Sequence, residues 1–332
     1  MTADTRPHIF IDGQAGTTGL QIAERLRARD DLQLLEIDAA ARKFDQARAE
    51  LMAQSDVTIL CLPDAAVAGA VTLAAGQCRL LDASSVHRTA PGWVYGLPEL
   101  GAEQRRQIAA ATQVSNPGCY PQGPILMLRP LIDAGWLDPK TPRSIHSVSG
   151  YSGGGRGMID AYRSFDSAEA ERFAARSYAL GLNHKHLPEM QRYAGLEQAP
   201  LFAPAVGNYY QGMLTHVPVF TSELQGQQSR KDVERLLAQR YQDDPCVRVI
   251  AIDEQDPCIE GYLDAGACNQ TNDIELMVFG NADQLLLIAR YDNLGKGAAG
   301  CAVQNLNLML GKAETTGLQL GAAAQSARAA TQ

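Results

Sequence analysis

The sequence predicts an α/β protein in which a doubly wound parallel sheet is followed by a second, α+β domain. Strand and helix patterns alternate over the first 116 residues, an order typical of βαβ units with parallel strands. Longer strand patterns and a hairpin turn dominate the segment that follows. The length of 332 residues also favours two domains.

The first domain is expected to begin with a short apolar strand, His8–Asp12, and a helix over Thr18–Arg29. Apolar residues recur at helical spacing in that helix. Similar patterns follow: we expect strands at Leu32–Ile37, Val57–Pro63 and Arg79–Ala83, and helices at Asp45–Gln54 and Ala65–Ala75. This succession predicts a Rossmann-type sheet, which binds ligands at the carboxyl ends of its strands.

The second domain combines longer strands with helices. We expect strands at Ser144–Ser149, Ala199–Thr221, Val247–Asp253, Ile274–Phe279 and Leu285–Tyr291, and helices at Lys231–Tyr241 and Ala298–Leu310. Gly280–Asp283 is a plausible hairpin turn between the last two strands, so the sheet should be mostly antiparallel. Residues 313–332 lack an apolar stripe and are expected to form a flexible tail.

The composition excludes several classes of protein. The 29 basic and 37 acidic residues give a net charge of −8, which disfavours binding to nucleic acid or an anionic membrane. The seven cysteines form no CxxC pair, so neither a metal knuckle nor a disulfide framework is indicated. The N-terminus lacks a secretory signal, and the apolar runs are too short to cross a bilayer. We therefore expect a cytoplasmic protein without nucleic-acid or membrane partners.

The glycine-rich segment Gly13–Gly19 lies between the first strand and the first helix, with the spacing G-x-x-G-x-x-G. A nucleotide pyrophosphate needs a tight turn, close approach to the backbone and free N–H groups at a helix N-terminus. Glycines at these positions supply all three. The segment therefore predicts a dinucleotide site, the alternative being an ordinary strand–helix turn.

Charged residues after the second strand bear on the choice of dinucleotide. Asp38 could accept hydrogen bonds from a ribose 2′-hydroxyl, which favours NAD. Arg42 and Lys43 follow closely and could pair with a 2′-phosphate, which favours NADP. We favour NADP, with a solvated helix start as the alternative reading of the two cations.

Cys119 is the strongest candidate for a nucleophile. It follows the turn residues Asn116–Gly118 and precedes a predicted helix, Gln122–Ala134, in whose first turn Pro121 and Pro124 are tolerated. The positive end of a helix dipole lowers the pKa of a thiol at this position. The pattern thus indicates a thiolate at neutral pH, against the alternative of a buried small residue.

A thiolate nucleophile needs an acid–base partner, and two histidines cluster at His184 and His186. On an extended strand both side chains could point the same way, with Glu189 nearby to orient an imidazole. The cluster lacks further ligands for zinc, so no metal is expected. An incidental surface loop is the other alternative.

Three further polar segments are candidate ligand sites. Ser147–Arg156 offers N–H and O–H donors for an anion, with charge from Arg156, although a flexible loop has the same composition. Asp82–Arg88 ends a strand of the first domain, at the edge where ligands bind. Asn293–Gly300 opens the last long helix and could approach a cofactor.

Together these motifs resemble the N-acetyl-γ-glutamyl-phosphate reductase family in its shorter subtype: GQAGTTG, CLPD, DASSVHR, SNPGCYP, SVSGYSGGGR, HKHLPEM and DNLGKGAAGCAVQNLNLM. The resemblance covers about residues 7–312, and the glycine run Ser152–Gly155 departs from the pattern. It implies a fold similar to those of aspartate-semialdehyde and glyceraldehyde-phosphate dehydrogenases. An NADP-binding domain over residues 1–116 would be completed by a returning helix, 298–312, with a catalytic and oligomerisation domain over 117–297 and a homotetramer or homodimer.

The resemblance also implies roles for individual residues. Cys119 would be the nucleophile and His184 the acid–base residue. Contacts to NADP(H) would come from Gly13, Gly16, Thr17, Thr18, Gly19, Arg42, Lys43, Pro63, Ser84, Asn293 and Gly297. Contacts to the substrate would come from Arg88, Asn116, Ser149, Gly150, His186 and Glu189.

The implied activity is the NADPH-dependent reduction of N-acetyl-γ-glutamyl phosphate to the semialdehyde and phosphate, through a cysteine thioester, in arginine biosynthesis. One alternative is a sister acyl-phosphate reductase that acts on aspartyl phosphate or a lysine-pathway substrate. Two more distant alternatives are a cysteine hydrolase and a catalytically silent NADP-binding module.

Overall fold

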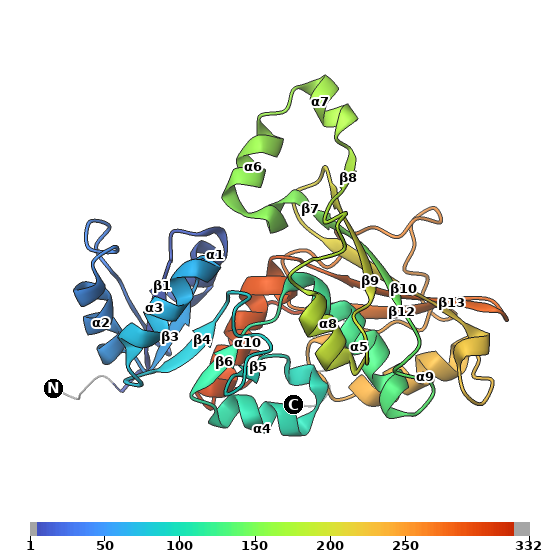
Figure 1. Cartoon of the computed structure of the whole chain (residues 1–332), viewed down its shortest axis with the longest axis horizontal. Helices are drawn as coiled ribbons and strands as arrows, with labels where there is room; N and C mark the ends of the chain where they lie inside the picture. The colour runs from blue at the N-terminus through green and yellow to red at the C-terminus, as the bar shows by residue number, and fades with distance from the viewer. Residues whose placement is uncertain (1–4, 322–332) are drawn as a thin grey trace. The chain divides into compact units, whose positions relative to one another are not determined.

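A computed structural model describes residues 5–321 of the chain, which divide into two compact units (Figure 1). Unit 1 comprises the residues up to Pro117 together with Ala298–Leu318. Unit 2 comprises Gly118–Gly297 and the described residues from Gln319 onward. The architecture confirms the predicted parallel sheet followed by an α+β domain.

Unit 1 is built on a parallel sheet that, in the described residues, has six strands in the order β2-β1-β3-β4-β6-β5. The strands are β1 (His8–Asp12), β2 (Gln33–Leu35), β3 (Val57–Leu60), β4 (Arg79–Asp82), β5 (Val94–Tyr95) and β6 (Gln113–Ser115). The helices are α1 (Thr17–Arg27), α2 (Asp45–Gln54), α3 (Asp64–Ala74), α4 (Ala102–Ala110) and α10 (Gly300–Met309). Strands β5 and β6 were not expected from the sequence, because two or three residues carry no readable periodicity.

Helices cover both faces of this sheet. On one face Ile9 packs in a single cluster with Ile22 of α1 and Leu306 of α10. On the other face Phe10 packs with Val67 of α3. Neighbouring residues of β1 thus serve opposite cores, as the pleat of a strand requires. Helix α10, red in Figure 1, comes from the end of the chain yet packs beside α1, α4 and β4.

Unit 2 contains a mixed sheet that, within the described residues, has seven strands in the order β11-β12-β13-β10-β7-β9-β8. The strands are β7 (Ser144–Gly150), β8 (Ala175–Ser177), β9 (Leu201–Gly207), β10 (Met213–Phe220), β11 (Val247–Val249), β12 (Ile274–Gly280) and β13 (Gln284–Tyr291). The helices are α5 (Cys119–Asp133), α6 (Gly155–Arg163), α7 (Ser167–Arg172), α8 (Leu187–Ala194) and α9 (Arg230–Tyr241). Strands β12 and β13 form the predicted hairpin, and most neighbouring pairs are antiparallel.

The expected strand over Ala199–Thr221 is two strands, β9 and β10, which lie on either side of β7. Gly212 between them has a φ of +107°, and a Cβ there would meet the carbonyl of Ala265. Only glycine accepts this backbone without strain. The chain therefore turns over the end of β7, where the N–H of Gly150 donates to the carbonyl of Gly212 at 2.9 Å.

The buried helix α5 begins at Cys119, three residues earlier than expected, so Pro124 lies inside it rather than in its first turn. A proline has no N–H for the carbonyl four residues earlier, which is Tyr120 for Pro124 and Leu126 for Pro130. A tyrosine hydroxyl lies beside each of these carbonyls. Tyr241 of α9 donates to Leu126 at 2.8 Å, and the Tyr291 hydroxyl lies 3.3 Å from the carbonyl oxygen of Tyr120.

The chain after α10 is held in place where a flexible tail was expected. Glu314 pairs with Arg105 of α4 at 2.8 Å and accepts a hydrogen bond from Gln304 at 2.7 Å. Thr315 and Leu320 are buried. Specific polar pairs hold this segment, and such pairs leave no apolar stripe in a sequence. Residues 322–332, the rest of the expected tail, lie outside the described residues.

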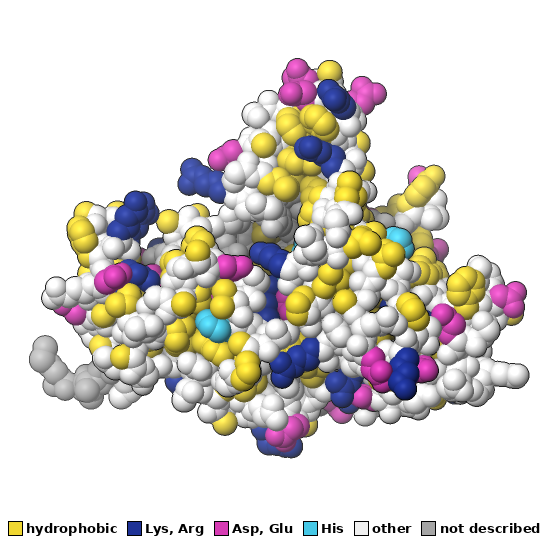
Figure 2. Space-filling model, in the orientation of Figure 1, with side chains coloured by type: hydrophobic (Ala, Val, Ile, Leu, Met, Phe, Trp, Pro, Cys, Tyr) yellow, Lys and Arg dark blue, Asp and Glu magenta, His cyan; other side chains and the backbone are white. Residues whose placement is uncertain are grey.

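Acidic and basic side chains are interspersed on the face of the molecule that Figure 2 shows. Among residues 5–321 every helix is too short or too polar to span a membrane.

We predict that Tyr241→Phe lowers the free energy of unfolding by about 1–3 kcal/mol, because it leaves the buried carbonyl of Leu126 without a donor. Urea denaturation followed by circular dichroism measures the change. The matched control is Tyr262→Phe, since Tyr262 is 78% exposed, and its effect should stay within about 0.5 kcal/mol. Equal stability of the two variants would contradict the role of the hydroxyl.

Candidate active site

A cavity of about 260 Å³ in unit 2 brings together the predicted nucleophile and the predicted acid–base residue. Cys119 and His184 both line it, and so do Ser149, Gly150 and His186. The remaining lining residues are Tyr120, Gly153, Gly154, Met158, Tyr178, Lys185 and Val206. Residues from four separate stretches of the chain therefore converge on one half-buried thiol.

Cys119 is the first residue of α5, preceded by Gly118 in an extended conformation. The carboxylate of Glu189, which is 1% exposed on α8, accepts a hydrogen bond from the N–H of Gly118 at 2.9 Å. This bond anchors the chain where it enters the helix. The thiol consequently lies at the positive end of the helix dipole, which favours its anionic form.

The Tyr291 hydroxyl fixes the same turn from β13. It donates to the carbonyl of Cys119 at 2.7 Å and accepts from the N–H of Gly123 at 3.3 Å. The hydroxyl is thus inserted between the N–H of Gly123 and the carbonyl of Cys119, which stand four residues apart in the helix. Pro124 follows Gly123 directly in the chain. Tyr291 is fully buried, so it has little freedom to move.

Gly297 packs directly against Cys119. It was predicted to contact a cofactor, but a Cβ at this position would lie 3.1 Å from the Cβ of Cys119 and 3.0 Å from the carbonyl oxygen of Asp292. Such distances are tighter than ordinary contacts, so a side chain here would displace its neighbours. Asn293, also predicted to contact the cofactor, forms its hydrogen bonds within unit 2. Its side chain accepts from the N–H of Gly212 at 2.8 Å and donates to the hydroxyl of Ser152 at 3.0 Å.

The two histidines do not lie on a strand, as the sequence had suggested, but on a turn that leads into α8. The N–H of His186 donates to Nδ1 of His184 at 3.1 Å, and the ring centroids are 4.7 Å apart. Because Nδ1 of His184 accepts, the proton of a neutral His184 ring resides on Nε2. Pro188 near the start of α8 explains the turn, since proline favours the first helical positions.

Tyrosines that the sequence did not single out complete the cavity. Tyr178 donates to the hydroxyl of Tyr120 at 3.1 Å, and the ring centroids of Tyr178 and His184 are 5.7 Å apart. Burial raises the pKa of Tyr178 to about 12, and the charge of Cys119 contributes to the rise. Burial also raises the pKa of Tyr120 well above its usual range. Both phenols therefore remain neutral at physiological pH.

The polar loop after β7 contributes less charge than expected. Gly150 allows close packing, because a Cβ there would lie 2.5 Å from the carbonyl oxygen of Tyr210. Arg156, expected to add charge for an anion, is not among the lining residues, and its side chain is 81% exposed beside Asp160. Residues 151–163 form a short 3₁₀ turn and α6, so the loop is helical rather than an open nest of N–H groups.

A second cavity, of about 680 Å³, lies in unit 1 at the glycine loop. Gly13 has a φ of +90°, and a Cβ there would collide with the carbonyl of Cys61. A Cβ at Gly19 would lie 2.7 Å from the carbonyl oxygen of Gly13, whereas Gly16 has only ordinary contacts and borders the cavity. Thr17 opens α1, whose N-terminus faces this loop. This cradle fits the pyrophosphate of a dinucleotide.

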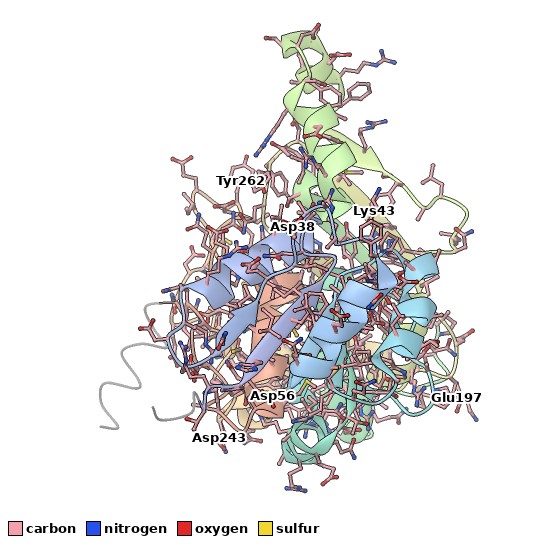
Figure 3. The ribbon with its side chains drawn as sticks, turned by 90° about the vertical axis from the view of Figure 1, so that its left-hand side faces the viewer. Asp38, Lys43, Asp56, Glu197, Asp243 and Tyr262 are labelled. Atoms are coloured by element: carbon pink, nitrogen blue, oxygen red, sulfur yellow. The ribbon has the colours of Figure 1, made fainter. Side chains whose placement is uncertain are left out.

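Arg42 and Lys43 line the same cavity, and Asp38 does not. The Asp38 carboxylate accepts from the N–H of Ala40 at 2.7 Å and so shapes the turn that carries the two cations. Figure 3 shows Asp38 and Lys43 near the upper edge of unit 1, whereas Asp56, which precedes β3, lies near the lower edge. The cations therefore stand at the carboxyl ends of the strands.

Several of the other predicted residues of unit 1 form hydrogen bonds within the protein instead of lining the cavity. Pro63 lines the cavity, whereas the Ser84 hydroxyl donates to Asp82 at 2.7 Å. Arg88 donates to the carbonyl of Asn116 at 3.0 Å, and the Asn116 amide donates to the carbonyl of Ala298 at 3.1 Å. Thr18 lies inside the first turn of α1. Among the described residues, no group of three or more metal-ligating side chains is present.

Comparison with known proteins gives consistent matches. The semialdehyde dehydrogenase dimerisation domain matches residues 119–293. The N-acetyl-gamma-glutamyl-phosphate reductase 2 of Nostoc sp. is 48% identical over 322 residues, covering 94% of this chain and 99% of the relative. The enzyme of the same name from Pseudomonas putida is 47% identical over 314 residues, with the same coverage.

Two solved structures share the fold. Aspartate semialdehyde dehydrogenase II from Vibrio cholerae, in complex with ASA, has a TM-score of 0.68 at 16% identity, covering 92% of this chain and 99% of its own. A probable aspartate-semialdehyde dehydrogenase from Pseudomonas aeruginosa has a TM-score of 0.69 at 16% identity, with the same coverage.

The domain match over residues 119–293 places the chain in the semialdehyde dehydrogenase class of oxidoreductases. The sequence relatives narrow this class further, because they cover nearly the whole chain at almost 50% identity. The chain belongs to the N-acetyl-γ-glutamyl-phosphate reductase family.

We predict that Gly297→Ala slows the reaction of Cys119 with iodoacetamide and lowers kcat about tenfold, because the new Cβ displaces the nucleophile. Mass spectrometry of the peptide that contains Cys119 gives the alkylation rate. Gly157→Ala is the matched control, since a Cβ at Gly157 meets nothing within 4 Å. Unchanged alkylation in Gly297→Ala would show that the contact does not position the thiol.

Proposed function

We propose that this protein reduces N-acetyl-γ-glutamyl phosphate to N-acetylglutamate 5-semialdehyde and phosphate, with NADPH as the reductant, in arginine biosynthesis. The observation that carries the proposal is the cavity in which Cys119, at the first turn of α5, faces the same space as His184. Membership of the reductase family supplies the substrate class. The dinucleotide cavity of unit 1 supplies a place for the cofactor.

Cys119 carries the covalent steps. Its thiolate attacks the acyl carbon, the bond from that carbon to the phosphate oxygen breaks, and inorganic phosphate leaves with the bonding electrons. The product is a thioester on Cys119. The cofactor, when bound, supplies a hydride to the thioester carbon. The resulting thiohemiacetal anion collapses, which breaks the carbon–sulfur bond and returns the thiolate to the start of α5.

His184 is the proposed hydrogen-bond donor to the oxygen on which negative charge develops. The hydrogen bond that Nδ1 accepts from the N–H of His186 places the proton of a neutral His184 ring on Nε2, which is a donor for oxygen. We assign it to the oxyanion of the thiohemiacetal, where such assistance contributes about 10²–10⁴-fold in rate. The neutral phenols of Tyr120 and Tyr178 line the same cavity without adding charge.

The remaining assignments follow from position. Ser149, Gly150 and His186 line the cavity and are assigned to the substrate, with Glu189 holding the helix start beneath it. Gly13, Gly16, Pro63 and the turn that carries Arg42 are assigned to the dinucleotide. The dimerisation-domain match supports a homo-oligomer, a dimer or a tetramer, and the biosynthetic role supports a cytoplasmic location.

NADP rather than NAD is proposed because of the cations at the carboxyl edge of unit 1. Arg42 and Lys43 are exposed, border the cavity and form no ion pair within the described part of the chain. They are therefore available to a 2′-phosphate. The carboxylate of Asp38, which would favour NAD, instead accepts a hydrogen bond from the N–H of Ala40 within its own turn.

Cys119→Ala is expected to abolish turnover and to leave NADPH binding within about twofold of the unaltered protein, because the substituted side chain belongs to the other cavity. Absorbance at the nicotinamide band measures turnover, and calorimetric titration measures binding. Normal turnover in this variant would rule out the thioester route and, with it, the proposed mechanism.

The assignment of the substrate is tested in the reverse direction. Purified protein is mixed with N-acetylglutamate semialdehyde, phosphate and NADP, and the formation of NADPH is followed. Aspartate semialdehyde is the control substrate. Phosphate-dependent activity with the first aldehyde supports the proposal, whereas activity confined to the second would move the protein to a sister acyl-phosphate reductase.

The double variant Arg42→Ala/Lys43→Ala is expected to raise the KM for NADPH at least about tenfold, since even one charge-assisted hydrogen bond contributes about 1.5–3 kcal/mol. The KM for NADH should change little, because NADH lacks the 2′-phosphate. Steady-state kinetics with NADPH and with NADH measures both KM values. An equal rise for both would show that the two cations do not read the 2′-phosphate.

A further inference from the structure

An acidic residue stands next to the proposed phosphate-binding loop. Asp12 is the last residue of β1, immediately before Gly13, and it borders the 680 Å³ cavity of unit 1. Its side chain is only 5% exposed. A dinucleotide carries two negative charges on its pyrophosphate, so a bare carboxylate here would oppose binding.

The charge of Asp12 is felt by its neighbours. Burial raises the pKa of the Cys61 thiol to about 12, and the negative charges of Asp82 and Asp12 contribute to the rise. Cys61 lines the same cavity, at the end of the neighbouring strand. The charge of Asp12 therefore acts on another group that borders this cavity.

Arg48 of α2 neutralises this carboxylate. Its Nη2 donates to Oδ2 of Asp12 at 2.6 Å and its Nε to Oδ1 at 3.1 Å, so the pair is bidentate. The Arg48 side chain is 13% exposed and also lines the cavity. Its Nη1 donates to Asp45 at 2.8 Å, but Asp45 is 71% exposed and well solvated.

We propose that Arg48 is a positioning residue for the dinucleotide, which acts by cancelling the charge of Asp12 beside the glycine loop. This inference rests on the proposed function, because it assumes that the cavity of unit 1 takes NADPH. It assigns to Arg48 a role distinct from that of Arg42 and Lys43, which face solvent and are left to pair with the ligand. Arg48 pairs with Asp12 and Asp45, and it lowers the electrostatic repulsion that an anion would meet at the glycine loop.

The experiment is calorimetric titration of NADPH into the full chain at low and at physiological salt. Arg48→Met is expected to weaken binding at least about tenfold, and the loss should shrink as salt screens the exposed charge. Asp12→Asn/Arg48→Met removes both charges and should restore affinity to within about threefold of the unaltered protein. Arg48→Lys keeps the charge and should retain most of the affinity.

Two further variants separate electrostatics from structure. Asp12→Asn alone should bind NADPH as well as or better than the unaltered protein, because the negative charge beside the glycine loop is removed while Arg48 keeps its positive charge. Asp45→Asn is the matched control: it removes the exposed partner of Arg48 and should leave binding unchanged. Circular dichroism and thermal unfolding without ligand confirm that each variant is folded.

The outcomes are decisive. Equal binding by Arg48→Met and the unaltered protein overturns the inference, and so does a folded double variant that stays as weak as Arg48→Met. If Arg48→Met does not fold, Asp12→Asn decides: a loss of more than about threefold overturns the inference and retained affinity supports it. Failure of the unaltered protein to bind NADPH would instead overturn the cofactor assignment on which the inference rests.

Discussion

The start of helix α5 is the structural constraint on which the proposed chemistry depends. A thiolate at its first residue needs a helix that begins there and does not fray. Glu189 secures the entering chain through Gly118, and the Tyr291 hydroxyl secures the first carbonyl. Because both groups are buried, Cys119 is positioned by side chains that have little freedom of their own.

The prolines of α5 explain why tyrosine hydroxyls were recruited. Pro124 and Pro130 each remove one helical hydrogen bond in a segment that is almost wholly buried. An unsatisfied carbonyl in such surroundings costs about 1–3 kcal/mol. Tyr241 satisfies the carbonyl of Leu126, which Pro130 leaves without a donor. Tyr291 lies beside the carbonyl of Tyr120, which Pro124 leaves without a donor, and its hydroxyl bridges Cys119 and Gly123. The hydroxyl that stabilises the helix is thus the same one that positions Cys119.

Local sequence patterns were sufficient for part of this arrangement. Alternating strands and helices predicted the parallel sheet, and turn residues ahead of a helix indicated Cys119 as a candidate nucleophile. The phenols of Tyr178 and Tyr291 could not be found in this way, because each reaches the site from a distant part of the chain. The histidine turn was mistaken for a strand because the spacing of His184 and His186 alone does not separate the two. Specific polar pairs, such as Glu314 with Arg105, leave no periodic signal either.

Charge is balanced differently in the two cavities. Around Cys119 burial raises the pKa values of the neighbouring phenols, so they stay neutral and add no negative charge that would repel a thiolate. At the glycine loop a carboxylate is present, but a bidentate arginine cancels it. The first cavity therefore favours a single resident anion that reacts, whereas the second favours an incoming anion that only binds. The distinction follows from which side chains the fold leaves charged, and it agrees with the proposed nucleophile in one cavity and the proposed cofactor in the other.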